Sequence, residues 1–233
     1  MRDRVKYIAH KGYSGIYPEN TELAFLKAAQ AGFDGAETDV HITADGEFIL
    51  NHDSLVRFAD GTGLEAEKTD FKTLSSKPLL NNTTDDEVYV CTLRRYLEIL
   101  RDNSMVCFVE IKSHLNADEI KSLYDLMAEV YDLDKCIVQS FDFENLRLSR
   151  EYVPTIPIML THGMGEKELG YERCFDGGFS IDVDYNMLDK KMIEDFHSRG
   201  LEVAVWTVNN ADDFNRLKDE DIDYIESDFC YFG

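Results

Sequence analysis

Two histidines and two carboxylates near the start of the chain have the types and spacing needed for acid–base and metal chemistry. His10 and His52 each follow a short apolar segment, and Glu37 and Asp39 lie two residues apart in another. In a β-strand, residues i and i+2 face the same side, so these two carboxylates point together. Paired carboxylates suit a hard divalent cation, and imidazole gives and takes protons readily near neutral pH. The four residues therefore predict a metal-assisted acid–base site.

A third acid, Glu110, ends the apolar segment 105–109 and is followed two residues later by Lys112. A carboxylate at such a position is costly to bury unless it is paired or bound to a metal. Taken alone, the pattern fits a Glu110–Lys112 ion pair as well as it fits a metal ligand. Three carboxylates that meet at one point cannot all stay ionised without a cation. Together with Glu37 and Asp39, Glu110 therefore predicts one divalent ion, Mg²⁺ or Ca²⁺.

Trp206 is the single tryptophan and lies near the end of a late apolar segment. An aromatic side chain at this place fits the core of a barrel and, equally well, a wall that faces the substrate.

Short apolar segments alternate with helical patterns along the whole chain. The expected strands are Val5–Ala9, Gly35–Val40, Phe48–Asn51, Met105–Ile111, Cys136–Gln139, Ile156–Leu160, Phe179–Ile181, Leu201–Val208 and Tyr224–Glu226. We expect a helix over 21–31, capped by Asn20, and further helices over 93–101, 117–131, 143–152, 188–199 and 211–217. Apolar strands interleaved with helices indicate a parallel sheet covered on its outer face. About eight such strands in 233 residues favour an α/β fold of the TIM type, a closed (β/α)₈ barrel, over an open sheet.

The polar segment from about residue 55 to 90 fits this alternation least well. We expect a loop or small excursion on the barrel rim, so that residues 1–233 form a single domain.

The charge of the chain excludes several classes of partner. Lys and Arg total 24 against 46 Asp and Glu, which gives a formal net charge of −22. Such a field repels nucleic acid and anionic membrane surfaces. No apolar stretch is long enough to span a bilayer, and the N-terminal residues lack the apolar core of a signal peptide. Five widely spaced cysteines without a C-x-x-C pair indicate free thiols, and we expect a cytoplasmic protein.

The motifs, taken in order, resemble those of the glycerophosphodiester phosphodiesterases over nearly the full chain. Each fragment alone is a weak signal, whereas the ordered set is specific. The segments that carry the resemblance are Ala9-His10-Lys11-Gly12, Pro18-Glu19-Asn20-Thr21, Glu37-Thr38-Asp39-Val40, His52-Asp53, Glu110-Ile111-Lys112, Gln139-Ser140-Phe141-Asp142, Trp206-Thr207-Val208-Asn209 and Ile225-Glu226-Ser227-Asp228.

The resemblance implies a TIM-type barrel with its site at the carboxyl ends of the strands. It implies hydrolysis of a small-molecule glycerophosphodiester to glycerol 3-phosphate and an alcohol. A divalent metal held by Glu37, Asp39 and Glu110 would lower the barrier to attack on the anionic diester, and His10 and His52 would be the acid/base pair. The nucleophile is either water or the glycerol 2-hydroxyl, which would give a cyclic phosphate that water then opens.

The resemblance also implies that Lys11 and Lys112 contact the phosphate, and from its position near the rim we expect Trp206 to contact the substrate. The family usually has arginine after the first histidine, and lysine keeps the charge but loses the bidentate fork.

Two other functions stay open on these residues. One is a phospholipase that acts on intact lipids, which the negative charge disfavours. The other is a non-catalytic barrel that binds phosphodiesters, which the retained histidines and carboxylates disfavour.

Overall fold

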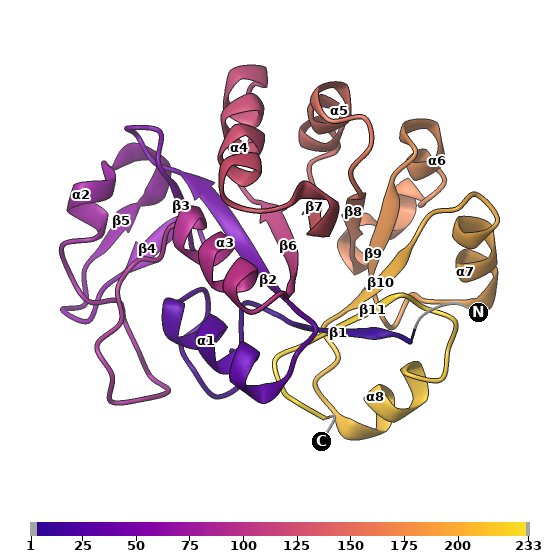
Figure 1. Cartoon of the computed structure of the whole chain (residues 1–233), viewed down its shortest axis with the longest axis horizontal. Helices are drawn as coiled ribbons and strands as arrows, with labels where there is room; N and C mark the ends of the chain where they lie inside the picture. Colours follow the sequence, from indigo (N-terminus) through magenta and orange to yellow (C-terminus); the bar gives the residue numbers. More distant parts are fainter. Residues whose placement is uncertain (1–3, 232–233) are drawn as a thin grey trace.

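A computed structural model describes residues 4–231 and contains the predicted barrel (Figure 1). Strand β1 pairs with both β11 and β2, which closes the sheet, and consecutive barrel strands run parallel. The expectation of a TIM-type (β/α)₈ barrel is therefore confirmed. The eight barrel strands are β1 (Lys6–Ala9), β2 (Gly35–Ile42), β6 (Val106–Ile111), β7 (Cys136–Ser140), β8 (Ile158–His162), β9 (Ser180–Asp184), β10 (Val203–Trp206) and β11 (Tyr224–Ser227).

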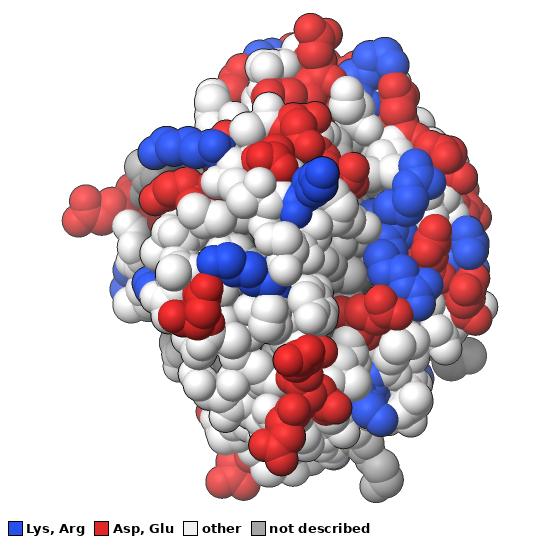
Figure 2. Space-filling view, turned by 90° about the vertical axis from the view of Figure 1, so that its left-hand side faces the viewer, with Lys and Arg blue, Asp and Glu red and all other residues white. Residues whose placement is uncertain are grey.

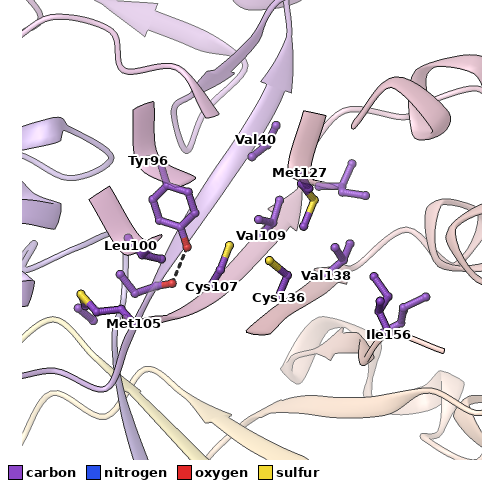
Figure 3. Packing of buried hydrophobic residues seen from close by; sticks show 14 of the residues in the cluster. Val40, Tyr96, Leu100, Met105, Cys107, Val109, Met127, Cys136, Val138 and Ile156 are labelled. Atoms are coloured by element: carbon purple, nitrogen blue, oxygen red, sulfur yellow. Dashed lines mark hydrogen bonds between the residues drawn. The ribbon is translucent and has the colours of Figure 1, made fainter. Parts of the chain in front are cut away.

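Helices follow the strands and cover the outside of the barrel, as Figure 1 shows. They are α1 (Glu22–Ala31), α3 (Leu93–Asp102), α4 (Ala117–Val130), α5 (Phe143–Tyr152), α6 (Arg173–Gly177), α7 (Lys190–His197) and α8 (Ala211–Leu217), with 3₁₀ turns η2 (Leu133–Lys135) and η3 (Met164–Leu169). The main core lies between these helices and the outward-facing strand residues. Figure 3 shows Cys107 and Val109 of β6 packed beside Cys136 and Val138 of β7. All five cysteines of the chain are free thiols.

The first helix begins one residue later than expected. Thr21 is its N-cap, and its hydroxyl accepts a hydrogen bond from the Ala24 amide. The prediction that Asn20 caps this helix is therefore wrong. Asn20 instead adopts a positive φ of 57°, a region in which asparagine is enriched, and its side chain lies against β2.

The barrel interior is built in layers, because alternate residues of each strand point inward. The lower layer is apolar and buried, and it consists of Ile8, Phe108, Ile137, Met159, Ala204 and Tyr224. Two residues further along the same six strands lie His10, Glu110, Gln139, Thr161, Trp206 and Glu226. The change from apolar to polar side chains marks the floor of the functional site, on the carboxyl side of the barrel.

The segment after β2 leaves the barrel and forms an excursion on its rim, at the left of Figure 1. Strand β3 (Phe48–Leu50) pairs antiparallel with β2 and is followed by the hairpin β4 (Leu55–Arg57) and β5 (Gly63–Glu65), by η1 (Ala66–Lys68) and by α2 (Phe71–Leu74). A small separate core that includes Val56, Phe58 and Leu74 holds the excursion together. The expected excursion is present, but it is more ordered than a loop. Three-residue strands are too short to show a period in sequence.

The face that carries this excursion bears interspersed acidic and basic side chains (Figure 2). Within residues 4–231, every helix is too short or too polar to cross a lipid bilayer.

Tyr96 of α3 ties two barrel strands together from outside. Its hydroxyl is fully buried, lies 2.6 Å from the Ala36 carbonyl, and accepts a hydrogen bond from the Phe108 amide at 3.1 Å. We expect Tyr96→Phe to lower the free energy of unfolding by about 1–3 kcal/mol, because the buried Phe108 N–H loses its acceptor. Urea denaturation of the two proteins measures the difference. An unchanged free energy of unfolding would show that the hydroxyl is not needed to satisfy this amide.

Candidate active site

The structure brings the predicted acids and the first histidine together at the carboxyl end of the barrel. Ligand atoms of Glu37, Asp39 and Glu110 lie within 4.8 Å of one another. Ligand atoms of His10, Glu37 and Glu226 form a second group within the same limit. Strands β2 and β6 are neighbours with Asp39 opposite Glu110, so the register of the sheet creates the acidic group.

Glu37 and Asp39 are both about 1% exposed, yet their surroundings differ. Burial, and then the charges of Asp39 and Glu110, raise the pKa of Glu37 well above its usual range. One oxygen of Glu37 accepts the Lys11 amide at 2.8 Å, whereas Oε1 has no hydrogen-bond partner within residues 4–231. Burial also acts to raise the pKa of Asp39, but the combined effects of the Lys112 and His52 charges and of the hydrogen bond with Asn20 outweigh burial, and the pKa is lowered.

Asn20 orients Asp39 and is a site residue that sequence reasoning placed elsewhere. Its Nδ2 donates to Asp39 Oδ2 at 2.8 Å. Its Oδ1 accepts from the Thr38 hydroxyl at 2.7 Å and from the Asp39 amide at 3.1 Å. Since one N–H of Asn20 is bonded to the carboxylate and its oxygen is bonded to the neighbouring Thr38 hydroxyl and Asp39 amide, Asn20 holds the carboxylate in one orientation.

Lys112 lies between two of the acids. Its ammonium is 2.7 Å from Glu110 Oε1 and 3.2 Å from Asp39 Oδ1. Burial acts to lower the pKa of Lys112, but Glu110 and Asp39 outweigh it and the pKa is raised. Burial raises the pKa of Glu110 against the opposing effect of Lys112. The Glu110–Lys112 ion pair that sequence left open is present, and Lys112 stays charged at the edge of the acidic group.

A carboxylate at the other end of the chain holds His10. Nδ1 of His10 lies 2.7 Å from Asp228 Oδ1, and Asp228 also accepts from the Ser14 hydroxyl and from Asn209 Nδ2. Burial acts to raise the pKa of Asp228, but the hydrogen bond with His10 and its charge outweigh it and lower the pKa to about 2. With Nδ1 engaged in this way, Nε2 is the nitrogen of His10 left for proton transfer.

His52 lies on the open side of the site, after β3. Its side chain is nearly half exposed, and Nδ1 lies 3.0 Å from Asp53 Oδ1. A cavity of about 300 Å³ adjoins it between the β1–α1 loop and the rim excursion; its lining includes Tyr17, Glu19, Asp53, Arg57 and Asn81.

Lys11 and Trp206 are in different surroundings from Lys112. The ammonium of Lys11 pairs with Glu19 at 2.6 Å. Trp206 is partly exposed, donates from Nε1 to the Asp182 carbonyl at 3.2 Å, and packs edge-on against Phe141. Trp206 therefore lies at the barrel mouth, with one edge anchored to β9.

The donor set fits a hard divalent cation. The group of Glu37, Asp39 and Glu110 offers carboxylate oxygens alone, and Glu37 Oε1 is buried without a hydrogen-bond partner in residues 4–231. Mg²⁺ and Ca²⁺ both prefer such ligands.

A sequence model of the glycerophosphoryl diester phosphodiesterase family matches residues 10–230. The chain belongs to this family. The enzyme is thus a metal-dependent phosphodiesterase that hydrolyses glycerophosphodiesters to glycerol 3-phosphate and an alcohol.

Related proteins support the assignment over the whole chain. The enzyme is 28% identical over 226 residues to the glycerophosphodiester phosphodiesterase of Caldanaerobacter subterraneus subsp. tengcongensis, covering 95% of this chain and 93% of that protein. It is 27% identical over 249 residues to glycerophosphodiester phosphodiesterase 1 of Homo sapiens, covering 91% of this chain and 74% of that protein.

Solved structures share the fold. A phosphodiesterase from Oleispira antarctica, solved with its product sn-glycerol-3-phosphate, matches with a TM-score of 0.86 at 22% identity, over 98% of this chain and 94% of that one. The glycerophosphodiester phosphodiesterase of Thermotoga maritima matches with a TM-score of 0.77 at 24% identity, over 98% and 96% of the two chains.

Several polar residues of the phosphodiesterase site were not singled out from sequence. Asp228 and Asn209 were noticed only as parts of family motifs, without a role. Asp182 and Glu226 are acids within apolar strands, a signal that resembles Glu110 and could have been read in the same way.

Proposed function

We propose that His10 and His52 are the acid/base pair of the phosphodiesterase, acting on a phosphate held at the mouth of the barrel. The observation that carries this proposal is the meeting of His10 with two buried carboxylates, Glu37 and Glu226, the first of which also belongs to the acidic group. The electrostatic effect of His52 on Asp39 supports a position of His52 beside the same group.

The two histidines have different surroundings, and these support different roles. Asp228 holds His10 and would stabilise its imidazolium, so His10 takes the proton of the attacking hydroxyl, from water or from the glycerol 2-position. His52 adjoins the open cavity, so it gives a proton to the departing alcohol. The alcohol part of the substrate then occupies the cavity beside Tyr17 and Arg57.

We also propose that Glu37, Asp39 and Glu110 hold the divalent cation, which is Mg²⁺ or Ca²⁺. When bound, the cation would polarise a non-bridging phosphate oxygen and offset its negative charge. Lys112 adds a positive charge next to the acids, and Lys11 and Trp206 contact the glycerophosphate at the rim. The Lys11–Glu19 ion pair supports a weaker grip on phosphate than a bidentate arginine would give.

An assay of glycerol 3-phosphate release from glycerophosphocholine, with chelator and then with restored Mg²⁺ or Ca²⁺, tests this function. We expect release that chelator abolishes and the preferred cation restores. Turnover of vesicle lipid alone would indicate a phospholipase, and binding of glycerophosphodiesters without release would indicate a non-catalytic barrel.

Asp228 is a positioning residue for His10 in this mechanism. We expect Asp228→Asn to lower kcat by at least about tenfold, because the imidazole loses the carboxylate that orients it and stabilises its charge. Ser14→Ala removes another donor to the same oxygen and serves as a control with a much smaller effect. Equal losses in both variants would argue against a specific role of the carboxylate.

Asp228 also gives the enzyme a pH-dependent stability. Because its pKa is lowered from 3.8 to about 2 in the folded state, ionised Asp228 contributes about 2 kcal/mol above pH 5. This contribution decreases as the pH falls through 3.8 toward 2, to about half at pH 3. The difference in unfolding free energy between wild type and Asp228→Asn, measured from pH 7 to pH 3, should shrink accordingly. A difference that stays constant over this range would contradict the assigned pKa.

The five free thiols support a reducing compartment, and we propose that the enzyme works in the cytoplasm as one domain that includes the rim excursion. Cell fractionation tests the location, and a single cooperative unfolding transition tests the one-domain organisation.

A further inference from the structure

Another histidine lies behind the loop that carries His52. His41 follows Asp39 by two residues on β2, so the two side chains share one face of the strand. The side chain of His41 is only 5% exposed, whereas the side chain of His52 is nearly half exposed. A buried imidazole needs a partner for each ring nitrogen, and these partners show what the ring does.

Both nitrogens of the His41 ring have partners. Nε2 lies 3.4 Å from the backbone carbonyl oxygen of His52, and Nδ1 lies 3.2 Å from the Ser113 hydroxyl. A carboxylate oxygen of Glu67 is 3.7 Å from Nδ1, which is too far for a hydrogen bond. A carbonyl oxygen only accepts, so Nε2 carries the hydrogen and donates it. Ser113 Oγ accepts from the Ile42 amide at 3.3 Å, which leaves its own hydrogen for Nδ1, so the ring is held in one orientation.

Through these bonds His41 joins three segments that border the site. It belongs to the strand of Asp39, Ser113 lies in the loop after β6, and the carbonyl is that of His52 itself. Among residues 4–231, no other hydrogen bond holds the backbone of His52. The preceding residue is also tied to β2, because the Asn51 amide donates to the Asp39 carbonyl at 3.1 Å. The loop is therefore attached to β2 at two successive residues, and His41 supplies the second attachment.

The backbone decides where the His52 ring lies. Within the described part of the chain, the ring is bonded only to the side chain of the next residue, Asp53, at 3.0 Å. That bond moves with the loop and does not fix the ring relative to the barrel. Misplacing a reacting group by about 1 Å can lower a rate by about 100-fold.

We propose that His41 is a positioning residue for the phosphodiesterase reaction: its Nε2 holds the backbone of His52, so that the His52 imidazole reaches the oxygen of the departing alcohol. The inference rests on the proposed role of His52 as the proton donor. His41 itself takes no part in the proton transfer.

Two variants of His41 separate the bond to His52 from the other contact of the ring. The Nε2 of glutamine lies as many bonds from Cα as the Nε2 of histidine, so His41→Gln keeps a donor for the His52 carbonyl. Asparagine is one carbon shorter, so His41→Asn keeps the contact with Ser113 and loses the donor to His52. We expect kcat for glycerophosphocholine to fall by about 10–100-fold in His41→Asn, with KM little changed, and to stay close to wild type in His41→Gln.

The leaving group distinguishes lost positioning from general damage. Choline needs a proton to leave, whereas p-nitrophenol is acidic enough to leave as the anion and gains little from a general acid. His41→Asn and His52→Ala should therefore both lose rate with glycerophosphocholine and keep most of their rate with the p-nitrophenyl ester of glycerol 3-phosphate. His114→Asn, at an exposed histidine outside the site, should match wild type with both substrates.

A second variant guards against misfolding. Circular dichroism and thermal melting show whether each variant is folded. Ser113→Ala removes only the hydroxyl that holds Nδ1 of His41, and it should show the same selective loss with glycerophosphocholine to a smaller degree. If His41→Asn does not fold, an unchanged rate in Ser113→Ala would overturn the inference.

The outcomes separate this inference from the role of His52. A selective loss in His52→Ala without one in His41→Asn would overturn the positioning role and leave the proton donor in place. Equal losses with both substrates in His41→Asn, or equal losses in His41→Asn and His41→Gln, would also overturn it. If His52→Ala slows both substrates equally, the proton-donor role of His52 is wrong. Crystal structures of wild type and His41→Asn then show separately whether His41 holds the loop: a displacement of residues 51–53 would support this, and an unchanged position would overturn it.

Discussion

Replacing either His10 or His52 with alanine should lower kcat for glycerophosphodiester hydrolysis by about 10²–10⁴-fold, the usual contribution of a general acid or base. The fold should stay intact, because neither imidazole belongs to the apolar core. Initial rates of glycerol 3-phosphate release measure the effect, and circular dichroism checks the fold.

A third histidine provides the control for this prediction. His114 is exposed and hydrogen-bonded to Asp142, and it has no part in the proposed site. His114→Ala should therefore keep nearly full activity. A rate close to wild type in His10→Ala or His52→Ala would remove that histidine from the mechanism.

The second large effect concerns the cation. Glu37→Gln should weaken binding of the divalent ion by more than about 100-fold. Replacing a residue that only supports a metal ligand lowers metal affinity by about 10–100-fold, and replacing a direct ligand should lower it further. Glu37 is buried, and burial and its acidic neighbours raise its pKa. It belongs to the group with Asp39 and Glu110 and also to the group with His10 and Glu226. Isothermal titration calorimetry of the metal-free enzyme with Ca²⁺ and Mg²⁺ measures the affinity.

The change should also remove activity, since the phosphate would lose the charge that offsets its own. Glu129→Gln, on the surface and paired only with Arg94 among the described residues, is the matched control and should bind the cation normally. A calorimetric affinity in Glu37→Gln equal to that of wild type would refute the assignment of Glu37 as a ligand.

Local spacing predicted the acids of the proposed metal site. Glu37 and Asp39 point together because alternate residues of a strand share a face, and Glu110 and Lys112 do so for the same reason. The register between β2 and β6 then places Asp39 opposite Glu110. The sequence indicates that these two apolar strands belong to a parallel sheet, whereas the register between them comes from the tertiary structure.

Long-range partners could not be predicted in the same way. Asp228 lies 218 residues from His10 in sequence, and only closure of the barrel through the pairing of β1 with β11 brings them together. Asn20 was predicted to cap a helix because asparagine favours that position. Its side chain instead donates a hydrogen bond to Asp39. The tertiary contact with Asp39 therefore outweighed the local preference of asparagine for the cap position.

The sequence by itself determined the alternation of strands and helices, the barrel class and the chemical type of the site, because period and residue type are local properties of the chain. The tertiary structure alone decided which side chains surround each charged group. It oriented His10 through Asp228, placed Lys112 between two acids, and brought Glu226 next to His10 and Glu37. The physical reason is that the pKa and ligand geometry of a buried group depend on distances of a few ångströms between strands that are far apart in sequence.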